Sequence, residues 1–381
     1  MKLRAFAFVL ICSIVLSACD EQAPVQQNVL PTTSGKNDAL ARKVQLDTLQ
    51  SGTRLFYRLS QDGTKLVTYI SNEAQPNDIS LRGAMLYNLD TGVKNKIDLG
   101  WLVPGSVVFS PKGDAFTYRT IVTPSSAYVY SIDTGHSLTV AKSLSTGSTP
   151  NEVLESGPRS FVWGDSGTEL YYIEGGFGTN SKIMKTQLQG LSTTQVVDLN
   201  NGQQIYGLAL LSSGRGIAFV VFDSLSEESN NSGIYVANAD GSNATVLTKA
   251  ILPQYTRISS AGARLLVEVP GDKMFWVDTQ SKATHYLPVH QVLPTGATLS
   301  ADGATILYAD VITSNDKSFQ RALHLLNVDT SRSNVVYTEV GDTPRFADAN
   351  QSLDWSSKGT TAVRTGWSTI SIVTLEKGTQ Q

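Results

Sequence analysis

The sequence predicts an all-β fold, a single seven-bladed β-propeller closed by a strand from its amino-terminal end. Two short signatures, each present seven times, predict this fold. A third observation is the apolar stretch Val44–Leu49, which belongs to no repeat. Blades of four antiparallel strands that recur at intervals of roughly 40 to 56 residues are typical of propellers.

The first signature is a tight turn between two apolar strands. Ser, Asp or Pro favours the early positions of such a turn, and Gly takes the position with positive φ. The seven turns are Ser60–Gly63, Ser110–Gly113, Gly164–Gly167, a shortened Ser213–Gly214, Ser259–Gly262, Ser300–Gly303 and Ser356–Gly359. Their final glycines lie between 41 and 56 residues apart.

The second signature is an alternating strand that ends in Asp-Thr-Gly or a close variant. Alternation with a period of two indicates half-buried strands, and the ending indicates a hairpin. The seven segments are Met85–Gly92, Tyr128–Gly135, Ile183–Gly190, Ile234–Gly241, Met274–Gln280, Leu323–Thr330 and Ile370–Leu375. Each repeat is therefore expected to hold four strands, with short turns after the first and third.

The last repeat predicts how the ring closes. It supplies three strands, Leu353–Trp355, Thr361–Arg364 and Thr369–Leu375, but no fourth. Val44–Leu49 is expected to fill that place, which would remove the exposed edges that favour aggregation. The irregular turn at Gly214 leaves six or eight blades as alternatives to seven.

These repeats resemble a known family. The turns Ser110-Pro-Lys-Gly113 and Ser300-Ala-Asp-Gly303, with the strand and turn Ile234–Gly241, are similar to the TolB/PD40-type, WD40-like repeat. The resemblance covers residues 41–381. It implies a propeller fold and a binding style, but no particular substrate. It does not include the α/β domain of TolB or the hydrolase domain of prolyl oligopeptidases.

The amino-terminal residues resemble a bacterial lipoprotein signal. Lys2 and Arg4 precede a short apolar run, and Leu16-Ser17-Ala18-Cys19 resembles a lipobox. The run is shorter than the roughly 20 residues that span a bilayer. We expect a signal peptide over 1–18, an acylated Cys19 and a flexible linker over 19–40, with the propeller over 41–381. An ordinary signal peptide is the alternative, and Asp20 leaves inner or outer membrane open.

Composition excludes several function classes. Cys12 and Cys19 are the two cysteines, so the expected mature chain has no thiol for a disulfide or a zinc site. The net charge of −3 is dispersed along the chain, which argues against a nucleic-acid partner.

No catalytic residue, metal site or cofactor is predicted. Gly164-Asp165-Ser166-Gly167 resembles the serine neighbourhood of trypsin-like proteases, but it occupies a blade-turn position. The oxygen-rich stretch Asn238–Asn243 is interpreted as a hairpin turn. None of the four histidines shows metal-ligand spacing; they are His136, His285, His290 and His324.

The variable loops predict the binding face. Loops after strands two and four differ widely in length and emerge on the same face of a propeller, where recognition is common. The alternative is that these loops merely tolerate insertions. Trp163, Trp276 and Trp355 are expected in the core between blades. The expected contact residues are Trp101, on a loop, Arg159, Tyr255, Arg257 and Arg345.

The sequence thus favours a monomeric lipoprotein of the bacterial cell envelope that faces the periplasm. The leading hypothesis is a non-enzymatic scaffold that binds an envelope protein. One alternative is a sensor for a small ligand or glycan at the mouth of the central channel. Another is a metal-dependent, lactonase-like hydrolase.

Overall fold

The structure is a computed structural model, and the compact unit that it contains spans Asn37–Gln381. It describes residues 40–45, 54–71, 83–103, 105–120, 126–142, 157–175, 180–199, 203–211, 216–223, 231–249, 252, 256–269, 274–288, 296–314, 318–342, 353–356, 360–364 and 369–374. The predicted signal peptide, Cys19 and almost all of the predicted linker lie outside these residues. In the described part of the chain no helix is long and apolar enough to cross a membrane.

The described elements are β-strands, and they form four-stranded antiparallel sheets. We call these sheets blades and number them along the chain. Blade 1 contains β2 (Arg54–Leu59), β3 (Lys65–Ser71), β4 (Ala84–Asn88) and β5 (Lys94–Ile97). Blade 2 contains β6 (Val108–Phe109), β7 (Ala115–Arg119), β8 (Ser126–Ser131) and β9 (Ser137–Lys142). Blade 3 contains β10 (Arg159–Trp163), β11 (Glu169–Glu174), β12 (Lys182–Gln187) and β13 (Ser192–Asp198).

The next three blades follow the same order. Blade 4 contains β14 (Gln203–Leu211), β15 (Gly216–Asp223), β16 (Gly233–Asn238) and β17 (Thr245–Lys249). Blade 5 contains β18 (Arg257–Ala261), β19 (Arg264–Glu268), β20 (Met274–Asp278) and β21 (Thr284–Tyr286). Blade 6 contains β22 (Ala297–Leu299), β23 (Thr305–Ser314), β24 (Ser318–Asn327) and β25 (Arg332–Asp342).

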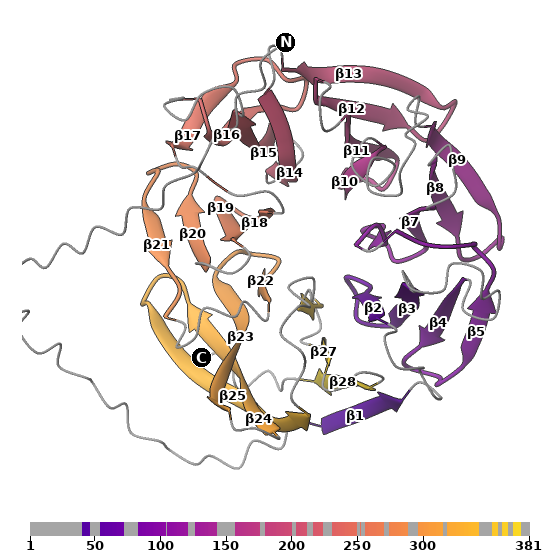
Figure 1. Ribbon diagram of the computed structural model, residues 1–381, viewed down its shortest axis with the longest axis vertical. Coiled ribbons are helices and arrows are strands. Elements are labelled where there is room, and N and C mark those ends of the chain that lie inside the picture. The colour runs from indigo at the N-terminus through magenta and orange to yellow at the C-terminus, as the bar shows by residue number, and fades with distance from the viewer. Residues whose placement is uncertain are drawn as a thin grey trace, which may run out of the picture. The chain divides into compact units, whose positions relative to one another are not determined.

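These six blades are continuous in the chain, whereas blade 7 is composite. It contains β26 (Asp354–Trp355), β27 (Thr360–Arg364), β28 (Thr369–Thr374) and, at its outer edge, β1 (Leu40–Gln45). β1 pairs antiparallel with β28, with Val44 opposite Ile370 (Figure 1). The pairing of an amino-terminal strand with the last repeat is therefore confirmed. Its bounds are corrected, because the strand begins at Leu40 and ends at Gln45 rather than covering Val44–Leu49.

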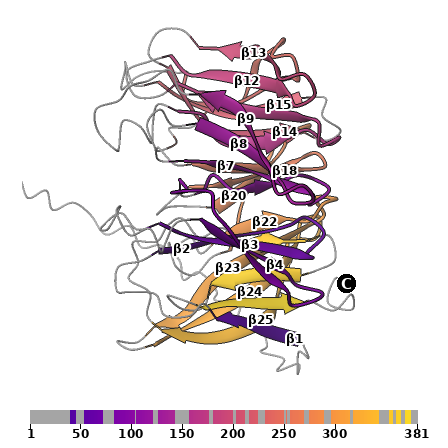
Figure 2. The same ribbon diagram turned by 90° about the vertical axis from the view of Figure 1, so that its right-hand side faces the viewer.

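The innermost strands define a ring. In the chain order of the blades, these strands are β2, β6, β10, β14, β18, β22 and β26. Each contacts the next, and β26 contacts β2, so the described residues form a closed circle of seven four-stranded sheets. Figure 2 shows the same strands from the side, with most of them running across the view. The fold is an all-β propeller with four-stranded antiparallel blades.

Apolar cores fill the spaces between neighbouring blades. One core combines Val67 and Tyr69 of blade 1 with Phe116 and Tyr118 of blade 2. Similar clusters join blade 2 to blade 3 and continue to the contact between blades 6 and 7. Burial of each large apolar side chain contributes about 1.5–3 kcal/mol, so the sheets are held face to face mainly by these cores.

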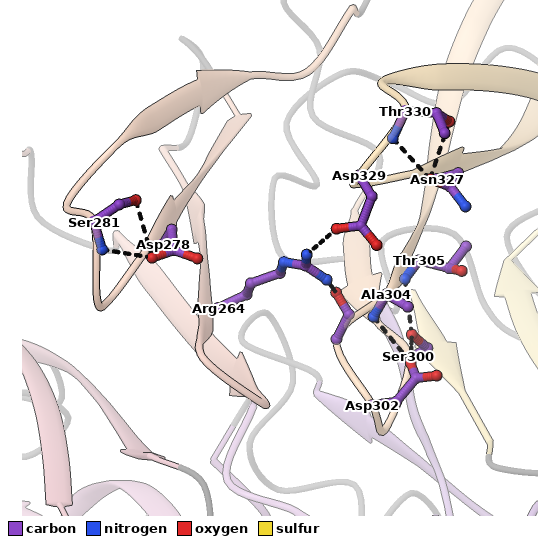
Figure 3. Close-up of polar contacts among 11 residues, drawn as sticks. Arg264, Asp278, Ser281, Ser300, Asp302, Ala304, Thr305, Asn327, Asp329 and Thr330 are labelled. Atoms are coloured by element: carbon purple, nitrogen blue, oxygen red, sulfur yellow. Dashed lines mark hydrogen bonds and ion pairs between the residues drawn. The ribbon is translucent and has the colours of Figure 1, made fainter.

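Four predicted tight turns have the expected chemistry, those that end at Gly63, Gly113, Gly167 and Gly303. The predicted turn Ser259–Gly262 is corrected, because Ser259 lies within β18, and the predicted turns at Ser213–Gly214 and Ser356–Gly359 fall wholly or partly outside the described residues. In the turn that follows β22, Gly303 has φ +72° and its amide donates to the Ser300 carbonyl at 2.8 Å. The Asp302 carboxylate accepts from the Ser300 hydroxyl at 2.5 Å and from the Ala304 amide at 2.9 Å (Figure 3). Gly164–Gly167 is the same kind of turn, with Gly167 at φ +73°. The hydroxyl of Ser166 contacts Thr168 at 2.7 Å, as a turn residue does.

Arg264 connects blades 5 and 6 at the end of the strands where these turns lie. Its Nη1 donates to the Gly303 carbonyl at 2.6 Å, and its Nη2 forms an ion pair with Asp329 (Figure 3). The guanidinium also lies over the Trp276 ring, 5.7 Å from the ring centre. Arg264 thus forms a contact between blades 5 and 6.

Candidate functional site

Arg257 and Glu268 form a pair on blade 5. Arg257 is the first residue of β18, Glu268 is the last residue of β19, and the two stand opposite each other in the strand register. Burial raises the pKa of Glu268, and the charge of Arg257 offsets this only in part. Burial likewise lowers the pKa of Arg257, against the opposing effect of Glu268. Both residues are half-buried.

Arg58 and Asp354 connect blade 1 with blade 7. The Arg58 Nη1 lies 2.9 Å from the Asp354 carboxylate, which also accepts from the Leu59 amide at 2.9 Å. The Nε of Arg58 donates to the Val107 carbonyl of the neighbouring chain segment at 3.1 Å. Burial by itself lowers the pKa of Arg58, but Asp354 and Tyr69 outweigh that effect and the pKa is raised. Arg58 of blade 1 therefore contacts both blade 7 and the residue just before β6 of blade 2.

Tyr69 lies beside the same group. Its hydroxyl accepts a hydrogen bond from the Gly105 amide at 2.8 Å. Burial raises the pKa of Tyr69 to about 12, although Arg58 and Arg257 both act in the opposite direction. The phenol therefore stays neutral at physiological pH.

Charges from blades that are not neighbours act on one another. Arg257 of blade 5 interacts electrostatically with Arg58 of blade 1 and with Asp354 of blade 7. We call the five residues Arg58, Tyr69, Arg257, Glu268 and Asp354 the central cluster. It gathers two guanidinium groups, two carboxyl groups and a phenol from three blades.

A second group of charges lies between blades 2 and 3. Arg119, the last residue of β7, is 1% exposed. Arg159, the first residue of β10, interacts with it electrostatically. Burial lowers the pKa of Arg119 to about 9, and the like charge of Arg159 adds to this shift. We call Arg119 and Arg159 the arginine pair.

The arrangement suits binding more than chemistry. Guanidinium groups pair with carboxylates or other oxyanions in a bidentate manner, and carboxylates accept hydrogen bonds from hydroxyl groups. Within the described residues, no group of three or more His, Cys, Asp and Glu side chains could hold a metal ion. Two of the described histidines are stacked on aromatic rings, His285 on Trp276 and His324 on Tyr308.

The structure places the predicted contact residues differently. Arg159 and Arg257 occupy equivalent positions, each at the start of an innermost strand, on the face where second strands end. Trp101 was expected on an exposed loop, but its side chain is 9% exposed. The reason is local: Leu102 bridges Thr120 and draws the segment into the core between blades 1 and 2. Tyr255 and Arg345 lie outside the described residues.

Five residues of these two groups were not predicted from the sequence. They are Arg58, Tyr69, Arg119, Glu268 and Asp354. A weak signal was present in two of them, because Arg119 and Glu268 each end a strand whose preceding residues are buried. A charged residue at the end of such a strand is uncommon, since unpaired burial of a charge is costly.

Comparisons with known proteins establish the fold. No protein-family model and no curated protein sequence matches the chain. Among solved structures, an oligogalacturonate lyase in complex with manganese is similar, with 12% identity, a TM-score of 0.61 and coverage of 90% of this chain and 98% of that chain. The β-propeller domain of the trilobed protease from Pyrococcus furiosus has 10% identity, a TM-score of 0.51 and coverage of 83% and 90%.

TolB from Acinetobacter baumannii is also similar, with 13% identity, a TM-score of 0.46 and coverage of 84% of this chain and 79% of that chain. The oligogalacturonate lyase and the trilobed-protease propeller show a shared fold, and at these identities the fold is all that they show. The predicted resemblance to TolB/PD40-type propellers is confirmed at the level of the fold.

Proposed function

We propose that this protein is a non-enzymatic binding propeller whose ligand is a small acidic saccharide held at the central cluster. The observation that carries the proposal is the meeting of Arg58, Arg257, Glu268 and Asp354 from three blades. Opposite charges held in a shared, half-buried site can recognise a molecule that carries both carboxylates and hydroxyls. Each guanidinium would pair with a carboxylate, and each protein carboxylate would accept from a hydroxyl.

The location favours a small ligand over the protein partner expected from the loops. The central cluster lies on the first and second strands of its blades rather than on exposed loops, and Tyr69 within it is 3% exposed. A folded partner would contact exposed side chains more readily than these. The choice of an acidic saccharide also draws on a protein that shares this fold at 12% identity and is named an oligogalacturonate lyase.

The experiment is a calorimetric titration of the purified protein with trigalacturonate. We expect saturable binding by the wild type. Replacement of one guanidinium in Arg257→Met should weaken it by about tenfold or more, since a charged hydrogen bond contributes about 1.5–3 kcal/mol. Arg264→Met removes an inter-blade arginine at the opposite end of β19 from Glu268. This variant should leave the affinity unchanged.

Three outcomes would contradict this proposal. If the wild type shows no saturable binding, or if Arg264→Met weakens it as much as Arg257→Met, the central cluster is not the saccharide site. If shorter oligosaccharides accumulate during the titration, the protein is an enzyme.

We also propose that the propeller is anchored to a bacterial envelope membrane through a lipid on Cys19 and faces the periplasm. The proposal rests on the lipobox-like residues Leu16–Cys19. Mass spectrometry of the protein expressed in bacteria should find a diacylglycerol-modified amino-terminal cysteine. Cys19→Ser should abolish the modification and release the protein from the membrane fraction.

A further inference from the structure

The connections between the strands fall on two opposite faces of the propeller. The turns between first and second strands lie side by side on one of them, which we call the turn face. A methyl group added at Gly113 would lie 3.4 Å from the Cβ of Ser60 in the turn of the preceding blade. One added at Gly167 would lie 3.9 Å from Pro111 in the same way. We call the opposite face, where the second strands end, the loop face.

Blade 7 is oriented in the ring like the other blades. The chain passes through it in the same order, from the innermost strand outwards. The Asp354 carboxylate of β26 accepts a hydrogen bond at 2.9 Å from the amide of Leu59, the last residue of β2. Leu59 leads directly into the turn Ser60–Gly63. The end of β26 therefore lies level with the end of β2, and the connection from β26 to β27 belongs to the turn face.

The strand β1 enters blade 7 from the turn face. Thr360 begins β27 at this end of the blade, and it stands opposite Thr374 at the end of β28. Thr374 also stands opposite Leu40, the first residue of β1. The predicted tether therefore reaches the propeller at the turn face, and β1 runs from there to Gln45 at the loop face.

Arg257 and Glu268 of the central cluster lie at the other face. Arg257 begins β18 and Glu268 ends β19, and the two stand opposite each other. Arg264, at the opposite end of β19, contacts the turn of blade 6 through the Gly303 carbonyl. The two ends of β19 are about 13 Å apart at roughly 3.3 Å per residue. The tether and the Arg257–Glu268 pair are thus separated by the depth of the ring.

The predicted tether is short compared with the propeller. Twenty residues, 20–39, separate Cys19 from Leu40. A flexible chain of this length has a root-mean-square span of about 25 Å. A domain of about 345 residues, the length of Asn37–Gln381, has a radius of gyration of about 20 Å. Because the two lengths are similar, a lipid on Cys19 would keep the attachment end of the propeller near the bilayer, and the rest of the ring would lie beyond it.

We infer that the turn face is the side of the propeller nearest to the anchoring membrane, and that the loop face, with Arg257 and Glu268, opens away from it. The inference rests on the proposed lipid on Cys19 and does not depend on the proposed saccharide. A partner or ligand of the loop face then arrives from the aqueous compartment. The partner that fits this orientation is a soluble molecule rather than a lipid of the same membrane.

The test is energy transfer from single labelled positions to an acceptor lipid. The full-length lipoprotein is expressed in bacteria, purified in detergent and bound to vesicles of phosphatidylethanolamine and phosphatidylglycerol that contain rhodamine-labelled lipid. Cys12 leaves with the predicted signal peptide, and Cys19 carries the proposed lipid. An introduced cysteine therefore supplies the thiol for the donor fluorophore.

Two matched pairs of exposed positions report the two faces, because fourth strands run from the turn face to the loop face as β1 does. Asp133→Cys, in the turn before β9, and Lys142→Cys, at the end of β9, label opposite faces of blade 2. Ala244→Cys, just before β17, and Lys249→Cys, at its end, do the same on blade 4. We expect higher transfer efficiency from Asp133→Cys and Ala244→Cys than from their partners. Blade 4 lies across the ring from β1, so its pair also detects a propeller that stands on its edge (Figure 1).

Equal transfer within both pairs, or higher transfer from Lys142→Cys and Lys249→Cys, overturns this orientation. Cys19→Ser combined with Asp133→Cys gives the baseline, because protein without the lipid should show no transfer. If the protein that retains Cys19 also stays unbound, the lipid anchor fails and this inference fails with it. That outcome is seen as unbound protein and is distinct from equal transfer by bound protein. Circular dichroism establishes that each labelled variant is folded.

Discussion

Glu268 shows how a single buried carboxyl group makes stability depend on pH. Because burial raises the pKa of Glu268, the folded state binds this proton more tightly than the unfolded chain does. The group therefore stabilises the fold at low pH, and this contribution is lost as pH rises through the raised pKa. We expect the melting temperature of the wild type, relative to Glu268→Gln, to fall as pH rises from about 4 to about 7.

Glu169 provides the matched control with the opposite sign. Burial alone would raise the pKa of Glu169, but hydrogen bonds from Lys185 and Gln187 outweigh burial and lower it. Its stabilising contribution is present above the unfolded pKa and is lost as pH falls. The wild type should therefore gain stability relative to Glu169→Gln over the same rise in pH. Parallel curves for the wild type and Glu268→Gln would show that Glu268 does not titrate as described.

The individual residues of the site could be predicted only in part. Arg159 and Arg257 were predicted from the sequence as contacts on the face where the variable loops emerge. Arg58 and Asp354 form an ion pair across 296 residues of sequence, and no local pattern links two such distant positions. Trp101 was expected to be exposed because glycine and proline flank it, but tertiary packing buries it.

At the scale of the strands and turns, Gly303 tests whether the repeated turn is built around a residue without a side chain. Its φ of +72° already disfavours other residues, and an added methyl group would lie 2.4 Å from the Ala261 carbonyl oxygen of blade 5. Gly303→Ala should lower the free energy of unfolding by about 2–4 kcal/mol, the sum of backbone strain and a steric clash.

Gly190 separates those two contributions. It has φ +81°, and an added methyl group there meets nothing within 4 Å. Gly190→Ala should therefore cost only the strain, about 1 kcal/mol. Denaturant unfolding of both variants measures the two values. Equal losses would indicate that the contact between the turns of blades 5 and 6 is not as close as described.

Strand order was predictable from the sequence because alternation and turn residues are local signals. Six blades follow the predicted order of four consecutive strands. The bounds of β1 were not predictable in the same way. Val44–Leu49 alternates better in hydropathy, but the pairing to β28 uses Leu40–Gln45, whose register is set by the partner strand.

At the scale of the whole molecule, the central cluster exists only because the ring is closed. Blade 7 supplies Asp354, and it is complete only when β1 pairs with β28. The Arg58–Asp354 ion pair then ties this composite blade to blade 1. The central cluster is therefore complete only in the closed ring.

The most direct measurement is disulfide formation between Lys43→Cys and Ser371→Cys, in a background with serine at Cys12 and Cys19. Lys43 stands directly opposite Ser371 in the pairing of β1 with β28. Opposed residues in antiparallel strands have Cα atoms about 4.5–5.5 Å apart, which a disulfide can bridge. We predict rapid crosslinking of the folded protein under mild oxidation. Lys43→Cys with Thr361→Cys, one strand further away on β27, should not crosslink. A failure of the first pair, or equal crosslinking of both, would contradict the closed ring.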